Sequence, residues 1–565
     1  MGTLFSALDI ARSGMQAAQI QMDVAGHNIA NVNKEGFSRQ RVSLASRYPN
    51  YRTYGALGRG VDVQTVERLR DAFLDQVYRQ QMPDLGSAEV RASYFGSIED
   101  VFHESDDSGL SSQINQFFSA LNDFATNVES QPYRQSVVSE ASALAATLRE
   151  VDQRLELLRT NANEEVRNLV PEINAIAERI ADLNDHIHDI EATGTEANDM
   201  RDERDLLADQ LAGLINVTIR ERADGQFDVL VGGELLVSGA TYRRIEAVRN
   251  PALDPERSDL VEVRFADNGH LVEVRSGELY GALSMRDTEV VAVTERIDTI
   301  AATLIEQINR IHAQGRGLVA WSGTVSSTNP VSVATDPLIA AGLPFDVTAG
   351  TIEVVVYDAS NSPTTTSITV TAGTTLASFI SDLNGIAGID ASLGADGVSL
   401  ELSAEAGHTL RFANDTSGVL TALGVNGLFT GRDAASIAIN SAVADDPRLL
   451  ASGYSVDLSE TGDNQAALAM AAVLDVAVVE NNTSTLTQYY ESTIVQIGIA
   501  ARSNTERLQV ERAFADDFEQ RRQEVSGVSL DEEVTNMILY QRAFEASSRV
   551  VSVTNAMLES LLAMF

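Results

Sequence analysis

The side chains best suited to chemistry are poorly spaced for it. His186 and His188 lie two residues apart in a stretch that predicts a helix, so their rings point in different directions and do not favour a shared metal ion. Asp106–Asp107 fall in a Ser/Gly-rich loop that lacks the spacing of a calcium-binding loop. Gly58–Gly60 lack the remaining glycine of a dinucleotide-binding fingerprint. We therefore predict no catalytic, cofactor or metal site in this chain.

Composition limits the remaining chemistry. The chain has no cysteine, which excludes a thiol nucleophile, a disulfide framework and a thiolate metal site. Acidic residues outnumber basic ones by 81 to 41, and a net charge of −40 disfavours binding to nucleic acid or anionic lipid. Among so many carboxylates some pairs occur by chance, so spacing alone leaves a glycosidase open as an alternative.

Length and the first residues give a second set of limits. With 565 residues, of which 44% are hydrophobic, the chain is long enough for roughly three or four domains. The N-terminal sequence has no basic leader followed by an apolar run and a small-residue cleavage site, so it does not predict a cleavable signal peptide. No apolar stretch reaches membrane-spanning length. We expect a protein that stays in the cytoplasm or is exported without cleavage.

The N-terminal region predicts one helix with an apolar stripe. Apolar residues recur in alternating steps of four and three, at Leu4, Leu8, Ala11, Met15, Ala18, Met22, Ala25 and Ile29. Such a helix spans roughly 40 Å, but its small residues and glycines make it marginal on its own. Periodicity alone leaves two interpretations: a helix docked on its own domain, which is the simpler one, or a helix that packs between subunits.

The C-terminal region predicts a second helix of the same kind. After a turn at Ser526–Gly527, the chain from Leu530 to Phe565 contains neither proline nor glycine. Its heptad stripe comprises Leu539, Ala543, Ala546, Val550, Val553 and Met557, and Leu558, Leu561 and Leu562 widen the apolar surface. Ser529 and Glu532 have the spacing of a capping box. Amphipathic helices at both ends indicate that the chain begins and ends in one place.

Between these ends the period of the apolar residues changes several times. Residues 132–194 predict a rod-like helix on the order of 90 Å long, with one stutter between Ala162 and Val166. Residues 466–525 predict a second long helix, antiparallel to the first. Residues 217–283 predict β-hairpins, and 325–431 predict strands around one helix.

The predicted fold is therefore a multidomain α+β fold. It has terminal coiled-coil helices, a long helical-bundle rod domain and an inserted β-rich outer domain. We expect residues 1–50 to join 526–565 in a terminal polymerisation domain, and 321–444 to form the outer domain. The rod domain would comprise 51–320 and 445–525, with a small β subdomain at 217–285.

Both ends of the chain carry motifs of one known family. The segment GHNIANVNKEGFSRQRVSL, residues 26–44, resembles the segment after the first helix of flagellar rod, hook and hook-associated axial proteins. His27 departs from that pattern, in which another asparagine is common. Residues 526–565 resemble the closing helix of the same proteins. The matching positions are Asn28, Asn31, Gly36, Phe37, Ser38, Arg39, Leu530, Glu532, Glu533 and Gln541.

Within this family, three features resemble the hook-associated members at the boundary between hook and filament. They are the run Phe37–Gln40, the stretch 457–473 and the long helical region after residue 132. The resemblance implies a non-enzymatic structural subunit, exported by the flagellar type III route and located in the extracellular flagellum.

The resemblance also implies partners and a subunit interface. Copies of the chain would form a ring between the hook protein and a second junction protein on the filament side, and an export chaperone would bind the C-terminal helix beforehand. The implied interface residues are Leu4, Leu8, Met15, Met22, Ile29, Leu539, Phe544, Val550, Val553, Met557, Leu558, Leu561 and Leu562. A hook or distal-rod protein with the same ends stays an alternative.

Overall fold

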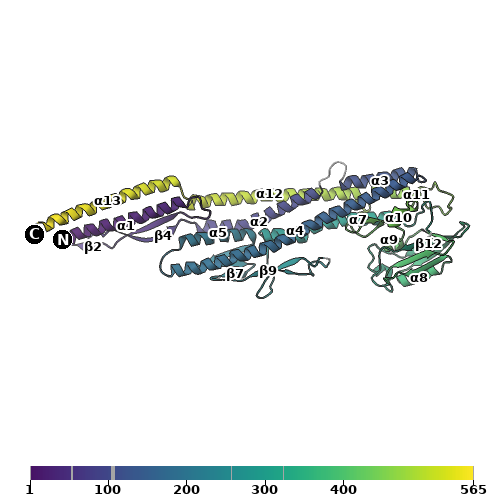
Figure 1. Ribbon diagram of the computed structural model, residues 1–565, viewed down its shortest axis with the longest axis horizontal. Coiled ribbons are helices and arrows are strands. Elements are labelled where there is room, and N and C mark those ends of the chain that lie inside the picture. The colour runs from purple at the N-terminus through teal and green to yellow at the C-terminus, as the bar shows by residue number, and fades with distance from the viewer. Residues whose placement is uncertain (1, 53–54, 103–108, 256, 322, 564–565) are drawn as a thin grey trace. The chain divides into compact units, whose positions relative to one another are not determined.

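A computed structural model describes residues 2–52, 55–102, 109–255, 257–321 and 323–563 (Figure 1). Long helices alternate with several small antiparallel sheets, which confirms the predicted multidomain α+β fold. The chain divides into two compact units: unit 1 comprises Met1–Ser93, Asn161–Met285 and Ser503–Phe565, and unit 2 comprises Tyr94–Thr160 and Arg286–Arg502. The three-domain division made from the sequence stays a prediction. Asp106–Asp107 lie outside the described residues.

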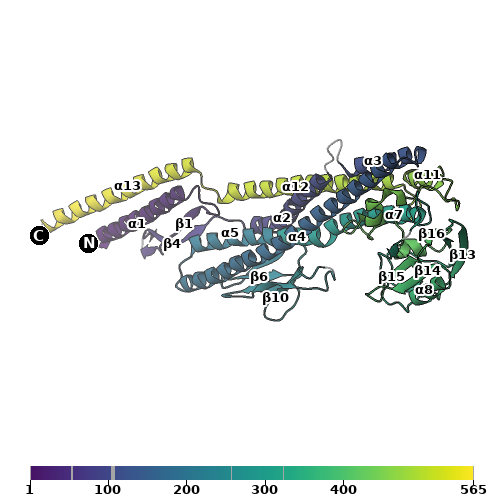
Figure 2. The same ribbon diagram turned by 45° about the vertical axis from the view of Figure 1, so that its right-hand side comes forward.

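The two ends of the chain lie side by side in unit 1. Helix α1 (Gly2–Ala30) and helix α13 (Leu530–Leu562) pack along each other and run antiparallel, so the N- and C-terminal ends are neighbours (Figures 1 and 2). Strands β1 (Gln40–Ser46) and β4 (Val61–Arg68) form an antiparallel ribbon that also contacts α1, and β2 (Asn50–Arg52) pairs with β3 (Gly55–Leu57). All other elements come between α1 and α13 in the sequence.

Helix α4 (Gln131–Glu191) is the predicted rod. It is continuous over 61 residues, through the stutter and through Pro171. Its predicted stripe is its buried face, because Leu148, Val166, Ile173 and Ile187 have no exposed surface. The heptad pattern therefore located both the helix and the side that faces the core.

Helices α2 (Ala72–Val101), α4 and α12 (Leu486–Ser526) each contribute residues to both units. Further elements, all in unit 1, follow α4 in the chain. These elements are α5 (Asn198–Leu214), the four-stranded sheet β5 (Val217–Glu221), β6 (Phe227–Val231), β7 (Glu234–Ser238) and β8 (Thr241–Tyr242), and the pair β9 (Ile245–Arg249) and β10 (Val261–Phe265). The hairpin prediction is wrong at its end, where α6 (Glu278–Ser284) replaces a strand. Gly277, at a φ of +91°, ends the extended segment, and Leu279 and Ala282 of α6 are buried.

Unit 2 holds the inserted β-rich region, in which the predicted helix is α8 (Leu376–Asn384) (Figure 2). Its strands form the sheets β11–β15–β14 and β13–β12–β16 and the pair β17–β18. The strand bounds are β11 (Thr324–Ser326), β12 (Gly350–Tyr357), β13 (Pro363–Val370), β14 (Ile389–Leu393), β15 (Leu400–Ala404), β16 (Thr409–Ala413), β17 (Phe429–Thr430) and β18 (Ala438–Ile439).

The helices wholly within unit 2 surround a second core. Helix α11 (Gln465–Ala472) packs on α3 (Leu110–Thr126) and on α7 (Val290–His312). The shorter helices are α9 (Val419–Leu423), α10 (Ser441–Asp445), the 3₁₀ turns η2 (Leu338–Ala340), η3 (Pro447–Leu449) and η4 (Val473–Asp475); the π-helical turn η1 (Met285–Glu289) begins at the last residue of unit 1. Across the described part of the chain, we find no helix long and apolar enough to cross a membrane.

The second predicted long helix is wrong at its start. Residues 466–525 form not one helix but α11, the turn η4 and, after a break, α12. In the break Glu480, Asn481 and Asn482 all have positive φ, between 50° and 65°, and the Thr483 N–H donates to the Val479 carbonyl at 3.0 Å. Such a left-handed turn is unfavourable for side chains other than glycine. Asparagine tolerates this conformation better than most other side chains, and the Asn/Ser/Thr cluster at 481–485 is a turn signal that the prediction of one continuous helix overlooked.

A buried histidine gives the core of unit 2 a pH dependence. The His312 Nδ1–H donates to the Asn426 carbonyl at 2.8 Å, and Nε2 accepts from the Ala451 N–H at 3.2 Å; the second contact requires the neutral ring, because a protonated Nε2 no longer accepts. Burial lowers the pKa of His312 to about 4. The unfolded chain, with a histidine pKa of about 6.5, takes up this proton first as the pH falls. The stabilisation that depends on a neutral His312 is therefore complete above a pH of about 6.5 and is lost as the pH falls towards 4.

We expect His312→Gln to flatten this dependence. In the parent chain the lowered pKa makes unfolding easier by about 3 kcal/mol between pH 6.5 and pH 4, and the variant lacks this contribution. Denaturant titrations across that range measure the difference. His186→Gln, at an exposed position of α4, is the control and keeps the parent profile. Identical profiles for His312→Gln and the parent chain would contradict the assignment.

Candidate assembly site on the terminal helices

Helices α1 and α13 approach closely because α1 carries small residues. A Cβ atom added at Gly14 would lie 3.0 Å from the Ser547 Oγ of α13. The small members of the predicted stripe, Ala11, Ala18 and Ala25, are buried. Its large members are half-buried: Leu4, Leu8, Met15, Met22 and Ile29. Within the chain α1 packs on α13, as the simpler interpretation of the N-terminal stripe expected, and subunit contacts of these residues stay a prediction.

Helix α13 has two apolar faces, and only one of them is covered. Thr554 is buried, and Phe544 and Leu558 are half-buried. The other face is the predicted heptad stripe, which we call the outer stripe: Leu539, Ala543, Ala546, Val550, Val553 and Met557. Its large side chains are 47% to 61% exposed. An exposed apolar surface of this kind on a folded chain marks a site of interaction.

The remaining predicted positions of α13 lie at its two ends and on its surface. Leu530 is 48% and Leu562 is 75% exposed, and Gln541 is also exposed. The side chain of Leu561 lies outside the described part of the structure. Subunit contacts of all these residues stay a prediction.

The N-terminal motif ties α1 to the chain that follows it. The Asn28 amide donates to the Gln40 carbonyl at 2.9 Å and accepts from the Gln40 N–H at 3.0 Å. The same amide donates to the Glu533 carboxylate of α13 at 3.2 Å. Asn28 is 1% exposed, so these polar groups have no access to water. One asparagine thereby closes the loop after α1 and joins both terminal helices.

Arg39 makes the second link between the two ends of the chain. The Arg39 guanidinium donates to Glu533 at 2.7 Å and to Glu532 at 2.8 Å. The backbone N–H of Arg39 donates to the Ser526 carbonyl at 2.8 Å. The predicted capping box is therefore only half formed. The Glu532 N–H reaches the Ser529 Oγ at 3.5 Å, while the Glu532 carboxylate pairs with Arg39 because that charge-assisted contact is the stronger one.

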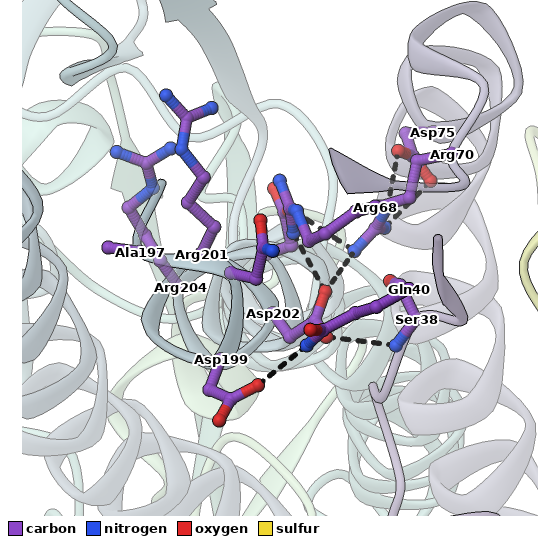
Figure 3. Close-up of polar contacts among 12 residues, drawn as sticks. Ser38, Gln40, Arg68, Arg70, Asp75, Ala197, Asp199, Arg201, Asp202 and Arg204 are labelled. Carbon is purple, nitrogen blue, oxygen red and sulfur yellow. Dashed lines mark hydrogen bonds and ion pairs between the residues drawn. The ribbon is translucent and has the colours of Figure 1, made fainter. Parts of the chain in front are cut away.

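The rest of the motif places the loop on α5. Gly36, at a φ of +74°, turns the chain so closely over α5 that a Cβ atom would lie 3.0 Å from the Leu206 side chain. The Ser38 N–H donates to Asp202 at 2.9 Å, and the Gln40 side chain donates to Asp199 at 2.8 Å (Figure 3).

Two family positions and His27 complete this end of α1. The Asn31 amide donates to the His27 carbonyl at 3.0 Å and so satisfies an end carbonyl of α1. The Phe37 ring meets the His27 ring edge-on, with centroids 5.4 Å apart. His27, the residue that departs from the family pattern, also lies 3.2 Å from Asp199.

Removing the Asn28 amide is expected to loosen this junction. Asn28→Ala leaves the buried N–H and carbonyl of Gln40 without partners, at a cost of about 2 kcal/mol. We expect faster hydrogen exchange of the Gln40 amide, by about thirtyfold. Asn31→Ala, which removes a bond at the end of the same helix but leaves that junction intact, is the matched control. Equal exchange at Gln40 in both variants would contradict the assigned role.

Behind the motif lies a closed ring of alternating charges, the arginine–aspartate ring. It comprises Arg70, Asp75, Arg522, Asp209, Arg79 and Asp205, and Arg70 closes it on Asp205. Successive members are 2.6 to 3.1 Å apart. Arg68 joins it from the end of β4, at 2.8 Å from both Asp202 and Asp205 (Figure 3).

The arginine–aspartate ring joins helices α2, α5 and α12, which adjoin the terminal helices. Asp75 and Arg79 belong to α2, Asp205 and Asp209 to α5, and Arg522 to the end of α12, four residues before the turn into α13. Each of these side chains is about nine-tenths buried. Such a network is stable only while every charge has its partner.

Asp205, a member of the ring, and Asp202, which pairs with Arg68 beside it, differ in the direction of their pKa shifts. Burial alone would raise the pKa of Asp205, but the charges of Arg70, Arg79 and Arg68 outweigh it and hold that pKa well below its usual range. Burial raises the pKa of Asp202, because Arg68 is its one close cation and Arg70 is 3.9 Å away. Asp205 is therefore the member that binds the ring together.

The arginine–aspartate ring was not predicted from the sequence. Asp202, Asp205 and Asp209 are spaced three and four residues apart, which places them on one face of a helix. That spacing is the signal that was available. Their arginine partners come from positions 68 to 79 and from 522, and no local pattern connects such distant segments.

The candidate residues for other chemistry stay apart. His186 and His188 are both exposed on α4. Over the described residues, the structure holds no group of three or more histidine, aspartate or glutamate side chains placed to bind a metal ion. The polar groups of this region are engaged in positioning helices.

Family models match three parts of the chain. Residues 95–324 match the helical domain of the flagellar hook-associated protein FlgK. Residues 8–37 match the flagella basal body rod protein family, and 519–564 match the C-terminal family of the flagellar basal body rod FlgEFG proteins. The C-terminal match covers all of α13, and the N-terminal match covers most of α1 and the motif residues from Asn28 to Phe37.

The individual proteins that the chain resembles are also flagellar hook-associated or hook junction proteins. The chain is 26% identical to flagellar hook-associated protein 1 of Bacillus subtilis over 577 aligned residues, covering 100% of this chain and 98% of the relative. It is 30% identical to the protein of that name from Escherichia coli over 261 residues, 46% of this chain and 47% of the relative. The solved flagellar hook junction protein FlgK from Burkholderia pseudomallei shares the fold, with a TM-score of 0.51 at 16% identity, over 80% of this chain and 100% of that one.

Proposed function

Because the chain belongs to the flagellar hook-associated protein 1 family, we propose that it is a structural subunit of the junction between hook and filament, and that it assembles through the outer stripe of α13. One observation carries the assembly part of this proposal. The outer stripe stays exposed even though α1 and α13 already cover each other's inner faces. An apolar stripe left over after a chain has packed both its ends is available to a neighbour.

The proposal extends to partners on either side of the junction. Copies of the chain form a ring, the hook protein lies on one side of it and a second junction protein on the filament side. An export chaperone covers the C-terminal helix before assembly, which suits an apolar surface that would otherwise face water. The net charge of −40 supports partners other than nucleic acid or membrane.

The proposed location is the extracellular flagellum, reached by flagellar type III export without removal of a signal peptide. A subunit of the hook or of the distal rod would have the same terminal helices, so location separates the two assignments. Antibody labelling of isolated hook–basal bodies tests it. We expect label only at the distal end of the hook, and label along the whole hook would contradict the junction role.

Deletion of residues 530–565 tests the part played by α13. We expect complete hooks without filaments, and filament protein released into the medium, because the subunit can no longer be retained at the junction. Electron microscopy and immunoblots of the medium measure both effects. Normal filaments on cells carrying the truncated chain would contradict the proposal.

A further inference from the structure

A groove of about 570 Å³ lies beside α1, on a different side from α13. Its apolar lining comes from Ile20 and Val24 of α1, Val66 of β4, Ile190 of α4, and Ala197 and Met200 at the start of α5. These six residues define what we call the α1–α5 groove.

The α1–α5 groove and the α1–α13 contact use different residues of α1. Gly14 and Asn28 face α13, as their contacts with Ser547 and Glu533 establish. Ile20 and Val24 line the groove. At about 100° per residue, the two pairs point in directions roughly 80° apart on average, so they occupy adjacent faces of the helix. The groove therefore remains open while α13 is in place.

The rim of the groove is acidic. Asp23, Glu196 and Asp199 all line it, and all three are exposed. His27 is 3.2 Å from Asp199, and neither lysine nor arginine is among the residues that line the groove. An occupant with apolar side chains and adjacent positive charge matches this surface.

The outer stripe of α13 has that chemistry. Arg542 and Arg549 lie beside it, roughly a sixth to a quarter of a turn from the line of Leu539 and Val550. Both arginines are exposed, and neither forms an ion pair with any described residue of the chain.

We propose that the outer stripe of one copy docks in the α1–α5 groove of a second copy, with Arg542 and Arg549 at the acidic rim. The groove extends along α1 from Ile20 to His27, one heptad of roughly 10 Å, which accommodates two successive knobs of a heptad stripe. Charge complementarity and matching spacing select a second copy as the occupant. This inference rests on the proposed function and names its interface.

The contact is heterologous, because it joins two different surfaces of the same chain. Such contacts propagate from copy to copy and close into a ring when the rotation permits, whereas a two-fold contact stops at a dimer. A ring needs no other contact between terminal domains. Each copy gives its outer stripe to one neighbour and its groove to the other.

Cysteine cross-linking tests the proposal without background, since the natural chain has no cysteine. Val24→Cys and Ala546→Cys are introduced into one chain, flagella are isolated and oxidised, and the products are separated by denaturing electrophoresis. We expect a ladder of dimers, trimers and larger oligomers from the double variant and monomers from each single variant. Dimers from Ala546→Cys alone would overturn the heterologous contact in favour of a two-fold one.

A charge exchange tests the rim. Asp23→Arg and Arg542→Asp are each expected to lower the yield of the ladder by about tenfold, because like charges then meet in the contact. Combining the two exchanges restores the yield. Loss of the ladder without such rescue would overturn the proposed pairing of the rim with α13.

The same preparations separate this inference from the proposed function. Antibody labelling reports whether the variant is present at the junction. Absence of the parent chain from the junction would refute the proposed function and, with it, this inference. Presence at the junction without a ladder, in this pair and in the second pair Ile20→Cys with Val550→Cys, would overturn the inference alone.

Discussion

Replacing Val553 by aspartate is expected to abolish filament attachment while leaving the chain folded. Val553 is 54% exposed on the outer stripe, so the charge meets water in the free subunit and changes its free energy of unfolding by no more than about 0.5 kcal/mol. In the assembled junction the same charge is buried against an apolar neighbour, at a cost of several kcal/mol, about 3 or more. Swimming assays and counts of filaments per cell measure the effect.

Ser552→Asp is the matched control for this variant. It places the same charge on the neighbouring residue of α13, whose side chain is exposed and polar. We expect normal filaments from Ser552→Asp and bare hooks from Val553→Asp. Normal motility of Val553→Asp, with the subunit present at the junction, would remove the outer stripe from the account of assembly.

Replacing Asp205 by asparagine is expected to destabilise unit 1 by about 3 kcal/mol or more, because Arg68, Arg70 and Arg79 would then share a buried site without its central charge. The shape of the side chain is kept, so the change isolates the charge. Denaturant unfolding measures the loss. Since Asp205 has a pKa held below the usual range, its stabilisation is present above the unfolded value of about 4 and disappears as the pH falls below it.

Glu203→Gln supplies the comparison on the same helix. Its carboxylate pairs with Arg179 at 2.7 Å, and both side chains are more than two-fifths exposed, so its loss costs no more than about 0.5 kcal/mol. Equal stability of the Asp205 and Glu203 variants would mean that the arginine–aspartate ring does not hold unit 1 together.

Periodic stripes were the part of the fold that the sequence predicted best. Helices α1, α4 and α13 each carry a heptad pattern over four or more turns, and each was found with bounds within a few residues of the prediction. In α4 that pattern also identified the buried face. Short-range information suffices where one side of a long helix must be apolar.

Two features of the fold had no such signal. The break at Glu480–Asn482 depends on three residues held at positive φ, and its signal is not periodicity but the Asn/Ser/Thr cluster at 481–485. The arginine–aspartate ring depends on segments separated by more than 400 residues, from Arg70 to Arg522. The ring is set by contacts between distant segments, which no local pattern predicts.

The two terminal stripes show most clearly what apolar periodicity does not predict. Both helices show the same periodicity, yet the stripe of α1 is largely covered and the outer stripe of α13 is exposed. A second apolar face of α13, which includes Phe544 and Leu558, packs within the chain instead. Periodicity predicts that a face is apolar, but the partner that covers it is set by how the two ends of the chain meet.

Thiol labelling of one residue tests the central claim, that the outer stripe is buried only between subunits. In a Val550→Cys variant the single cysteine is exposed in the free subunit. We predict rapid modification of the purified subunit by a maleimide and protection of the same cysteine in isolated hook–filament junctions. Equal rates of modification in the two states would contradict the account.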